Sequence, residues 1–264
     1  MADLKSFDRV AHLYDETRGV PAEAEQQIGD GLAALLRGIA GSPHLLEVGI
    51  GTGRIAVPLA ERGVRVTGID ISTKMLAILR GKRADIDLMI AEASRPPLRD
   101  RSFDAALFVH VLHLVPDPEA TVRATIGLVR AGGFMIEAGD DREQSLRSQA
   151  DELIRSIVEE LSGVDIGGWA PYARGAQLFT EIVREAGAEV QTALLARWTS
   201  STTGQRMLDR LKRRDYSSSW KIPDAVMPAL LERVTPRIAE LFGDLDRTIE
   251  YSRSFSMRYA RLPD

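Results

Sequence analysis

Short apolar runs alternate with amphipathic stretches over the first half of the chain. The apolar runs predict strands at residues 45–48, 64–69, 86–90, 103–109 and 134–138. Apolar positions recur at helical spacing over 21–40, 53–62, 72–80 and 118–130, with Pro21 in a first helical turn and Ser72 as an N-cap. Residues 131–133 predict a turn before the last of these strands. Strands that alternate with helices predict an α/β fold with a doubly wound, mostly parallel sheet.

The pattern changes after Asp140. Helical spacing is found at 143–161, 175–186, 205–214 and 225–242, and Gly187 is suited to end the second of these helices. Residues 163–172 contain Gly and Pro and predict a loop, and the polar stretch 200–203 predicts a break before the later helices. Alternating patterns at 190–198 and 251–259 predict two further strands, separated by mainly helical sequence.

Composition narrows the class of protein. The chain has 264 residues and a net charge of −4, which argues against a general nucleic-acid or membrane-surface binder. It has no cysteine, which excludes disulfides, thiolate metal sites and a cysteine nucleophile, and we expect no metal centre. No apolar run approaches ~20 residues, and the first residues lack the apolar region of a signal peptide. We therefore expect a soluble, cytoplasmic protein with no membrane partner.

A glycine-rich turn follows the first apolar run, and a carboxylate ends the second. Gly49 and Gly51 allow the backbone to turn sharply and to approach a ligand that a Cβ would exclude. A helix that opens at Gly53 would direct unpaired N–H groups at that ligand. Asp70 lies 19 residues after Gly51, where a carboxylate can bind two ribose hydroxyls. These features predict a β-α-β unit that binds a nucleotide-like ligand.

The spacing of the glycines distinguishes between nucleotides. A dinucleotide-binding fingerprint would place its third glycine at position 54, where this chain has Arg54. The observed Glu47-x-Gly-x-Gly-x-Gly53 resembles motif I of the class I S-adenosylmethionine (SAM)-dependent methyltransferases, and Asp70 is similar to their ribose-binding acid. The resemblance implies a seven-stranded Rossmann-like sheet, SAM as the cofactor and S-adenosylhomocysteine as the product.

The resemblance covers roughly residues 7–139 and implies further cofactor contacts. Tyr14 and Arg18 are similar to the Tyr-Asp-x-x-Arg segment of methyltransferases of the ubiquinone/menaquinone biosynthesis group, which closes over SAM; the alternative is an ordinary amphipathic helix. Glu92 with Ala93 resembles the pair that binds the adenine, although the family usually has Asp, and a surface Glu is the alternative. Met75 resembles the residue that packs on the adenine, or is a core methionine. The cofactor-binding candidates are Tyr14, Arg18, Glu47, Gly49, Gly51, Gly53, Asp70, Ile71, Met75, Glu92, Ala93 and Val109.

The segment after residues 103–109 faces the methyl group and the acceptor in the resembled family. It lacks the Asn/Asp-Pro-Pro-aromatic motif that is usual in enzymes that methylate planar amino groups. His110 is a candidate proton acceptor because an imidazole titrates near neutrality. His113 resembles a histidine of the quinone-pathway relatives, and its alternative role is structural. Methyl transfer requires a base only where the acceptor carries a proton of high pKa.

The last two strands normally form a hairpin in the resembled fold, whereas here they are far apart. We therefore expect a SAM-binding core of residues 1–199 and 249–264 and an inserted helical cap of residues 200–248, with 140–173 adding to the substrate side. Four aromatic residues could line an acceptor pocket or equally anchor the cap: Trp169, Tyr172, Tyr216 and Trp220. The Lys/Arg cluster at 210–214 is an RNA patch or a solvated helix face.

The preferred prediction is a SAM-dependent methyltransferase (EC 2.1.1.-) that acts on a small organic molecule, as a monomer or homodimer and without a nucleic-acid partner. One alternative is an RNA methyltransferase on the same core, which would bind phosphates through its cap and lose affinity steeply with salt. Others are a non-catalytic module that binds SAM or a nucleotide, and an NAD oxidoreductase with an irregular fingerprint.

Overall fold

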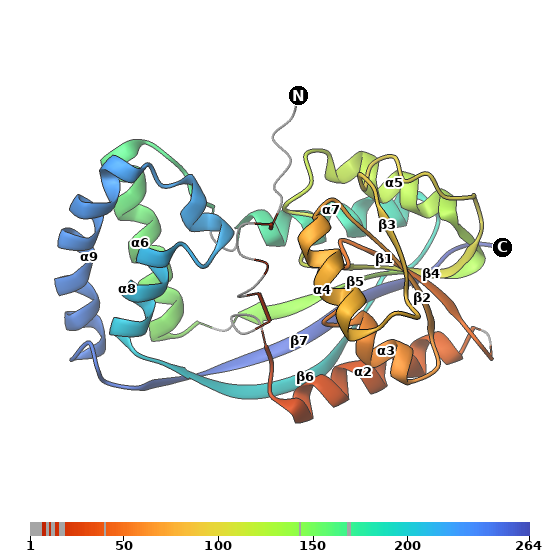
Figure 1. Cartoon of the computed structure of the whole chain (residues 1–264), viewed down its shortest axis with the longest axis horizontal. Helices are drawn as coiled ribbons and strands as arrows, with labels where there is room; N and C mark the ends of the chain where they lie inside the picture. The colour runs from red at the N-terminus through yellow and green to blue at the C-terminus, as the bar shows by residue number, and fades with distance from the viewer. Residues whose placement is uncertain are drawn as a thin grey trace. The chain divides into compact units, whose positions relative to one another are not determined.

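The computed structural model of the chain describes residues 7–8, 11, 14–15, 19–39, 41–142, 144–167 and 170–264 (Figure 1). The chain divides into two compact units. We call the first the sheet unit; it comprises Met1–Asp140, Tyr172–Ala196 and Phe255–Asp264. The second, here the helical unit, comprises Asp141–Pro171 and Arg197–Ser254.

A seven-stranded sheet organises the chain, with the strand order β3-β2-β1-β4-β5-β7-β6. Its strands are β1 (His44–Val48), β2 (Arg65–Asp70), β3 (Asp87–Ile90), β4 (Phe103–Val109), β5 (Val129–Arg142), β6 (Gln191–Thr202) and β7 (Ile249–Arg261). The pairs β1–β2, β2–β3, β1–β4 and β4–β5 are all parallel. The predicted doubly wound, Rossmann-like sheet is therefore confirmed.

Helices of the sheet unit connect and cover these strands. They are α2 (Ala22–Arg37), α3 (Ala56–Glu61), α4 (Thr73–Lys82), α5 (Pro118–Leu128) and α7 (Ala170–Glu185). Leu46 and Phe108, both fully buried on neighbouring strands, share one core with Phe179 and Val183 of α7. After β1 the chain adds β2 and β3 on one side of β1, and it then crosses back to add β4 on the other side. Such a switch point opens a crevice at the carboxyl ends of the two strands, which is where open α/β sheets bind ligands.

Local sequence signals explain several element ends. The Ser72 side chain accepts a hydrogen bond from the Met75 amide, so the predicted N-cap of α4 is confirmed. Gly187 has φ +86°, as expected of the glycine that ends α7. The predicted turn at 131–133 is wrong, because these residues form an irregularity inside β5, where the pairing with β4 shifts register between Phe103 and Ala105.

Two other boundaries differ from the prediction. The loop expected at 163–172 is shorter, since α7 already begins at Ala170. The polar residues 200–203 were expected to form a break before the later helices. Instead, β6 continues through this stretch as far as Thr202. Thr and Ser side chains suit an extended backbone as well as a loop, and polarity alone did not distinguish the two.

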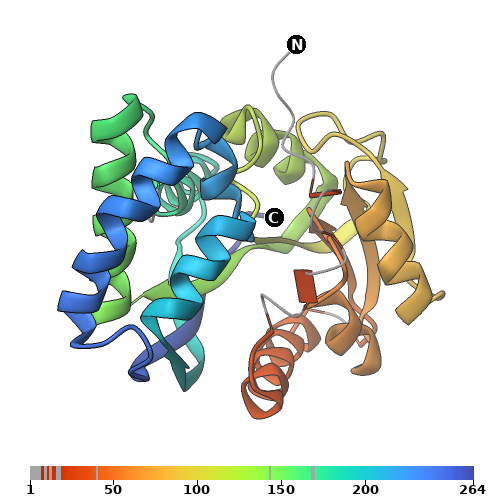
Figure 2. The ribbon, with the colours of Figure 1, turned by 60° about the vertical axis from the view of Figure 1, so that its left-hand side comes forward.

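The helical unit is built from α6 (Leu146–Ser162), α8 (Gly204–Arg213), α9 (Met227–Phe242) and the short 3₁₀ helices η2 (Ser217–Lys221) and η3 (Asp224–Val226). The ribbons of α6 and α9 run side by side in both views (Figures 1 and 2). Helices α6, α8 and α9 share one apolar core, to which they contribute Ile157, Leu211 and Ile238, respectively. Helix α6 therefore belongs to the same packed unit as the 200–248 segment. No helix among the described residues is long and apolar enough to cross a membrane.

Candidate cofactor and acceptor site

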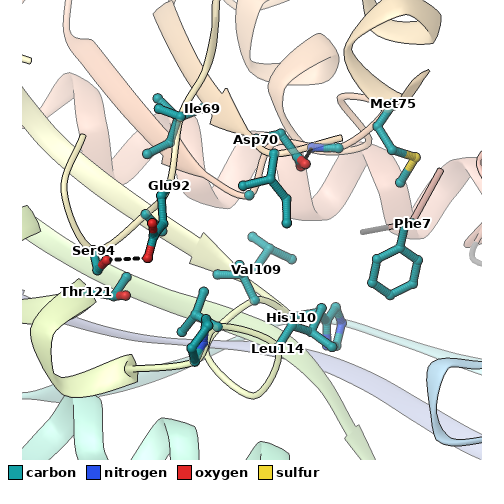
Figure 3. Close-up of a pocket in the computed structure, with 18 of the residues that line it drawn as sticks. Phe7, Ile69, Asp70, Met75, Glu92, Ser94, Val109, His110, Leu114 and Thr121 are labelled. Atoms are coloured by element: carbon teal, nitrogen blue, oxygen red, sulfur yellow. Dashed lines mark hydrogen bonds between the residues drawn. The ribbon is translucent and has the colours of Figure 1, made fainter. Parts of the chain in front are cut away.

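An open cavity lies at the carboxyl ends of the strands (Figure 3). The residues that line it, within the described part of the chain, belong to the sheet unit. The lining residues are Phe7, Tyr14, Gly49, Gly51, Ile69, Asp70, Ile71, Met75, Ala91, Glu92, Ala93, Ser94, Val109, His110, Val111, Leu114, Val115, Pro116 and Thr121.

The strand order arranges four lining residues of this cavity in a row. Glu92 follows β3, Asp70 ends β2, Gly49 follows β1 and His110 follows β4. These four strands are consecutive neighbours in the sheet and are spaced by about 4.8 Å. A ligand that lies along this edge can therefore meet all four positions.

The turn requires glycine for two reasons, which are its backbone conformation and the lack of space for a Cβ. Gly49, Gly51 and Gly53 have φ of +73°, +56° and +79°, a backbone conformation that residues with a Cβ rarely adopt. A Cβ on Gly49 would lie 2.5 Å from Val111, and a Cβ on Gly53 would collide with Leu79. Gly49 and Gly51 line the cavity, whereas Gly53 does not. Helix α3 begins only at Ala56, so the helix expected to open at Gly53 starts later.

Asp70 holds this turn while facing the cavity. Its Oδ2 accepts the Gly51 amide at 2.9 Å, and its Oδ1 accepts the Ser72 amide at 2.8 Å. Burial raises the pKa of Asp70, and the hydrogen bonds from Ser72 and Gly51 oppose that rise. Each carboxylate oxygen retains a second lone pair, so Asp70 can also accept hydroxyl groups of a ligand.

Glu47 lies beneath the turn, on β1. Its side chain is 3% exposed, and Oε2 has no hydrogen-bond partner within the described part of the chain. Burial raises the pKa of Glu47 to about 8; the charge of Arg54 opposes this effect and that of Asp70 adds to it. Glu47 is not among the lining residues, although Gly49, two positions later, is.

The N-terminal segment contributes two aromatic rings to the wall of the cavity. The rings of Phe7 and Tyr14 meet edge to face at 5.8 Å, and both line the cavity. Asp15 accepts a hydrogen bond from the Thr52 hydroxyl at 2.5 Å and pairs with Lys82 at 2.6 Å. This segment is therefore tied to the glycine turn. Arg18, the other cofactor-binding candidate of this segment, lies outside the described residues.

The remaining cofactor candidates surround the β2 and β3 ends. Glu92 and Ala93 line the cavity, and the Ser94 hydroxyl donates to Oε1 of Glu92 at 2.9 Å (Figure 3). Ile71, Met75 and Val109 also line it, and Met75 is buried at the same time. An apolar wall beside a carboxylate is the arrangement that a purine ring with an exocyclic amino group would require.

His110 follows β4 in a left-handed conformation, with φ +52°. Its Nε2 lies 3.2 Å from Oδ2 of Asp140, and its ring packs against Tyr172 at 5.2 Å and Phe255 at 6.4 Å. His113 packs edge to face on the same Tyr172 ring at 5.9 Å and is not among the residues that line the cavity. Of the two histidines, only His110 therefore faces the cavity.

The four aromatic candidates for an acceptor pocket are not brought together within one unit. Tyr172 is buried in the sheet unit behind His110. Tyr216 and Trp220 belong to the helical unit, where the Tyr216 hydroxyl accepts from Arg210 at 2.6 Å and Trp220 Nε1 donates to the Arg214 carbonyl at 2.8 Å. Trp169 lies outside the described residues.

Several residues of the site carried no recognisable sequence signal. Asp140 lies far in sequence from its partner His110. Asp15 belongs to the Tyr-Asp-x-x-Arg segment, but its contact with Thr52 carries no sequence signal. Ser94 lies two positions after Glu92 and could have been proposed from that spacing. Only the tertiary structure identifies the others.

The charge of the cavity distinguishes between possible cofactors. Among its described lining residues two are carboxylates and none is Lys or Arg. A dinucleotide carries a diphosphate, which favours basic groups or a helix N-terminus, whereas SAM carries a positive sulfonium. The carboxylates, the open glycine turn and the apolar wall therefore fit SAM.

Comparison with known proteins agrees with this assignment. Residues 46–136 match the family described as "Methyltransferase domain". The part of the chain that contains the glycine turn is thus similar to a methyltransferase domain, in agreement with the prediction from the glycine motif.

Named relatives match different lengths of the chain. Demethylmenaquinone methyltransferase of Renibacterium salmoninarum is 30% identical over 132 residues, which cover 50% of this chain and 56% of the relative. The chain thus spans about half the length of this curated relative. An uncharacterized methyltransferase of Mycobacterium bovis is 27% identical over 234 residues, which cover 89% of this chain and 86% of the relative.

A solved structure extends the likeness of fold to almost the whole chain. A SAM-dependent methyltransferase of Thermotoga maritima has a TM-score of 0.51 and 18% sequence identity, and it covers 97% of this chain and 98% of its own. At this identity the likeness shows the fold alone.

Proposed function

We propose that the protein transfers the methyl group of SAM to a small organic acceptor and releases S-adenosylhomocysteine. The observation that carries this proposal is a row of four residues on consecutive strand ends along one cavity: Glu92, Asp70, Gly49 and His110. The described residues that line this cavity include no Lys or Arg. When bound, SAM supplies a methyl carbon already activated by a positive sulfur. The protein then has to align the acceptor and exclude water.

Each part of the cavity has a role in this proposal. The Asp70 oxygens would accept the ribose hydroxyls, and Glu92 with Ala93 would bind the adenine edge. Phe7 and Tyr14 would cover the ligand with apolar surface and keep water out. The space beside His110 would then receive the acceptor.

The charge of the cavity favours a small acceptor over RNA. An RNA substrate would need Lys or Arg near the reacting end to hold its phosphates, and the described lining residues include neither. The basic residues at the end of α8 pair within their own unit, since Arg213 contacts Asp215 at 2.9 Å and Arg214 contacts Asp224 at 2.6 Å. These contacts support the solvated-face interpretation of the 210–214 cluster.

Calorimetry with S-adenosylhomocysteine tests the cofactor part of the proposal. Asp70→Ala removes a charged acceptor from two ribose hydroxyls, each bond worth about 1.5–3 kcal/mol, so we expect Kd to rise at least about 100-fold. Asp70→Asn keeps one acceptor oxygen and should bind with intermediate affinity. Asp100→Ala, at an exposed turn, is the matched control and should bind like wild type.

Two results would contradict the proposal. A folded Asp70→Ala protein with wild-type affinity would mean that Asp70 does not bind the ribose. Tight binding of NAD by a protein that binds neither SAM nor S-adenosylhomocysteine would remove the proposal altogether.

A further inference from the structure

Two carboxylates of the N-terminal segment, Asp8 and Asp15, contact the elements that carry the cavity. We propose that both are positioning residues for the cofactor. They hold the rings of Phe7 and Tyr14 against it, and a cofactor bound at Asp70 strengthens their attachment and so slows its own release. The inference rests on the proposed binding of SAM and S-adenosylhomocysteine.

The N-terminal segment contains the same pair of residue types twice, an aromatic residue followed by aspartate. The pairs are Phe7-Asp8 and Tyr14-Asp15. Both rings line the cavity and meet edge to face at 5.8 Å. Figure 3 shows the Phe7 ring at the side of the cavity that Met75 of α4 also lines. Each ring that lines the cavity is therefore followed directly by a carboxylate.

Asp8 is attached at the start of α4. Its Oδ1 accepts the Ser72 hydroxyl at 2.5 Å and the Lys74 amide at 3.2 Å. The Lys74 amide belongs to the first turn of α4, where amides have no acceptor within the helix and the helix dipole favours a carboxylate. Ser72 is 1% exposed, so Asp8 provides an acceptor for a hydroxyl that water hardly reaches.

Asp15 is attached at the glycine turn and at the other end of α4. Its Oδ1 accepts the Thr52 hydroxyl at 2.5 Å, and its Oδ2 lies 2.6 Å from Nζ of Lys82, the last residue of α4. Nζ of Lys82 also donates to the Thr52 carbonyl at 2.9 Å, so the three residues contact one another in a closed triangle. Helix α4 has 10 residues and is about 15 Å long. The N-terminal segment is thus attached at two well-separated points.

Both attachment points also hold Asp70. Its Oδ1 accepts the Ser72 amide, and its Oδ2 accepts the Gly51 amide, one position before Thr52. A ligand whose ribose is bound by Asp70 therefore also fixes the two segments whose hydroxyls donate to the N-terminal carboxylates. Because coupling between two binding events is reciprocal, an attached N-terminal segment favours the bound ligand to the same extent.

This arrangement should affect the release of the ligand more than its capture. The two rings cover a ligand that has already entered, so a weaker attachment raises koff and leaves kon nearly unchanged. S-adenosylhomocysteine is the suitable probe for these rates. It lacks the positive sulfonium of SAM, so the loss of a carboxylate charge alters its affinity little through long-range electrostatics.

The first test measures both rates by surface plasmon resonance with the full chain and S-adenosylhomocysteine. Asp15→Asn keeps the shape of the side chain but removes the charge that pairs with Lys82, and we expect koff to rise about three- to tenfold with kon changed less than about twofold. Asp8→Ala should have an effect of similar size. Asp85→Asn is the matched control, because it removes another ion pair of 2.6 Å, with Arg83 directly after α4, and should behave like wild type. A wild-type koff in either of the first two variants would overturn the proposal.

The second test separates positioning of the rings from support of the glycine turn. In a protein that carries Phe7→Ala and Tyr14→Ala, Asp15→Asn has no ring left to position. We therefore expect it to change koff less than about twofold in that protein, against the larger effect in the wild-type background. A residue that merely supports the turn through Thr52 would raise koff by the same factor in both backgrounds, and this result would overturn the proposal.

The Lys74 amide reports the attachment of Asp8 directly, through its hydrogen exchange measured by nuclear magnetic resonance. Saturating S-adenosylhomocysteine should slow its exchange at least about threefold in wild type and less than about 1.5-fold in Asp8→Ala, which lacks the acceptor. The Arg206 amide, held by Thr203 at the start of α8 in the helical unit, is the internal control and should respond equally in both proteins. A Lys74 amide that the ligand protects equally in both proteins, or in neither, would overturn the coupling.

The outcomes also separate this inference from the proposed function. A folded wild-type protein that does not bind S-adenosylhomocysteine contradicts the proposed function itself. A protein that binds it with a koff that does not depend on Asp8 and Asp15 leaves the proposed function intact and overturns this inference alone.

Discussion

Replacing Glu47 by Gln should change how the stability of the protein depends on pH. Glu47 is buried on β1, and its folded-state pKa is about 8, against an ordinary value of 4.5. A carboxyl with a raised folded pKa is protonated in the folded state while it is already ionised in the unfolded chain. Its contribution to stability is therefore fully present below pH 4.5 and is lost as the pH rises to about 8.

The two pKa values set the size of this effect. They differ by about 3.5, and at 1.36 kcal/mol per pKa unit the loss between pH 4.5 and pH 8 is on the order of 5 kcal/mol. Glutamine has nearly the same shape but does not ionise, so Glu47→Gln should lack this loss. Any cost of packing the amide is the same at every pH, which makes the change with pH the informative quantity.

Urea unfolding followed by circular dichroism, at several pH values between 4.5 and 8, measures the difference. We expect the stability of Glu47→Gln relative to wild type to rise steadily over this range. Glu189→Gln, at an exposed position, is the matched control and should run parallel to wild type. Parallel curves for Glu47→Gln and wild type would show that Glu47 is ionised in the folded protein, and would refute the argument from burial.

Two further predictions concern the binding of SAM and the role of the helical unit. Glu92→Gln keeps one acceptor oxygen, so its affinity for SAM in calorimetry should lie between those of wild type and Glu92→Ala; equal affinity in all three proteins would make Glu92 a surface residue. Replacing residues 143–168 and 203–248 together by short turns should leave SAM binding within a few-fold, because every described lining residue belongs to the sheet unit. Both segments must be removed, since α6 shares its core with α8 and α9; a truncated protein that melts cooperatively but loses SAM affinity would contradict this prediction.

Local patterns in the sequence were sufficient for most of the sheet unit. The first five strands are apolar runs, and Ser72 is an N-cap whose bond spans three residues, so both can be recognised within a short window. The irregularity inside β5 could not be predicted, because a glycine pair after a helix is equally typical of a turn. Its location depends on the pairing of β5 with β4.

The site could be predicted only where its parts follow one another closely. The glycine turn and the carboxylate of Asp70 are joined by the β-α-β unit itself, so their spacing was informative. The contact between His110 and Asp140 depends on two strands lying side by side, and the contact between Asp15 and Thr52 depends on where the N-terminal segment docks. Neither leaves a periodicity or a spacing in the sequence.

The order of the strand ends also has a consequence for how such a protein can diversify. In the proposed assignment, the cofactor contacts other than Val109 fall at the ends of β1, β2 and β3, while the acceptor would lie beside residues that follow β4 and β5, on the other side of the switch point. Substitutions after β4 can therefore alter which molecule is modified without disturbing the nucleoside pocket, because the two sets of loops share no segment of chain. Changing the acceptor in this scaffold then becomes a problem of redesigning two loops, with the energy of cofactor binding held constant.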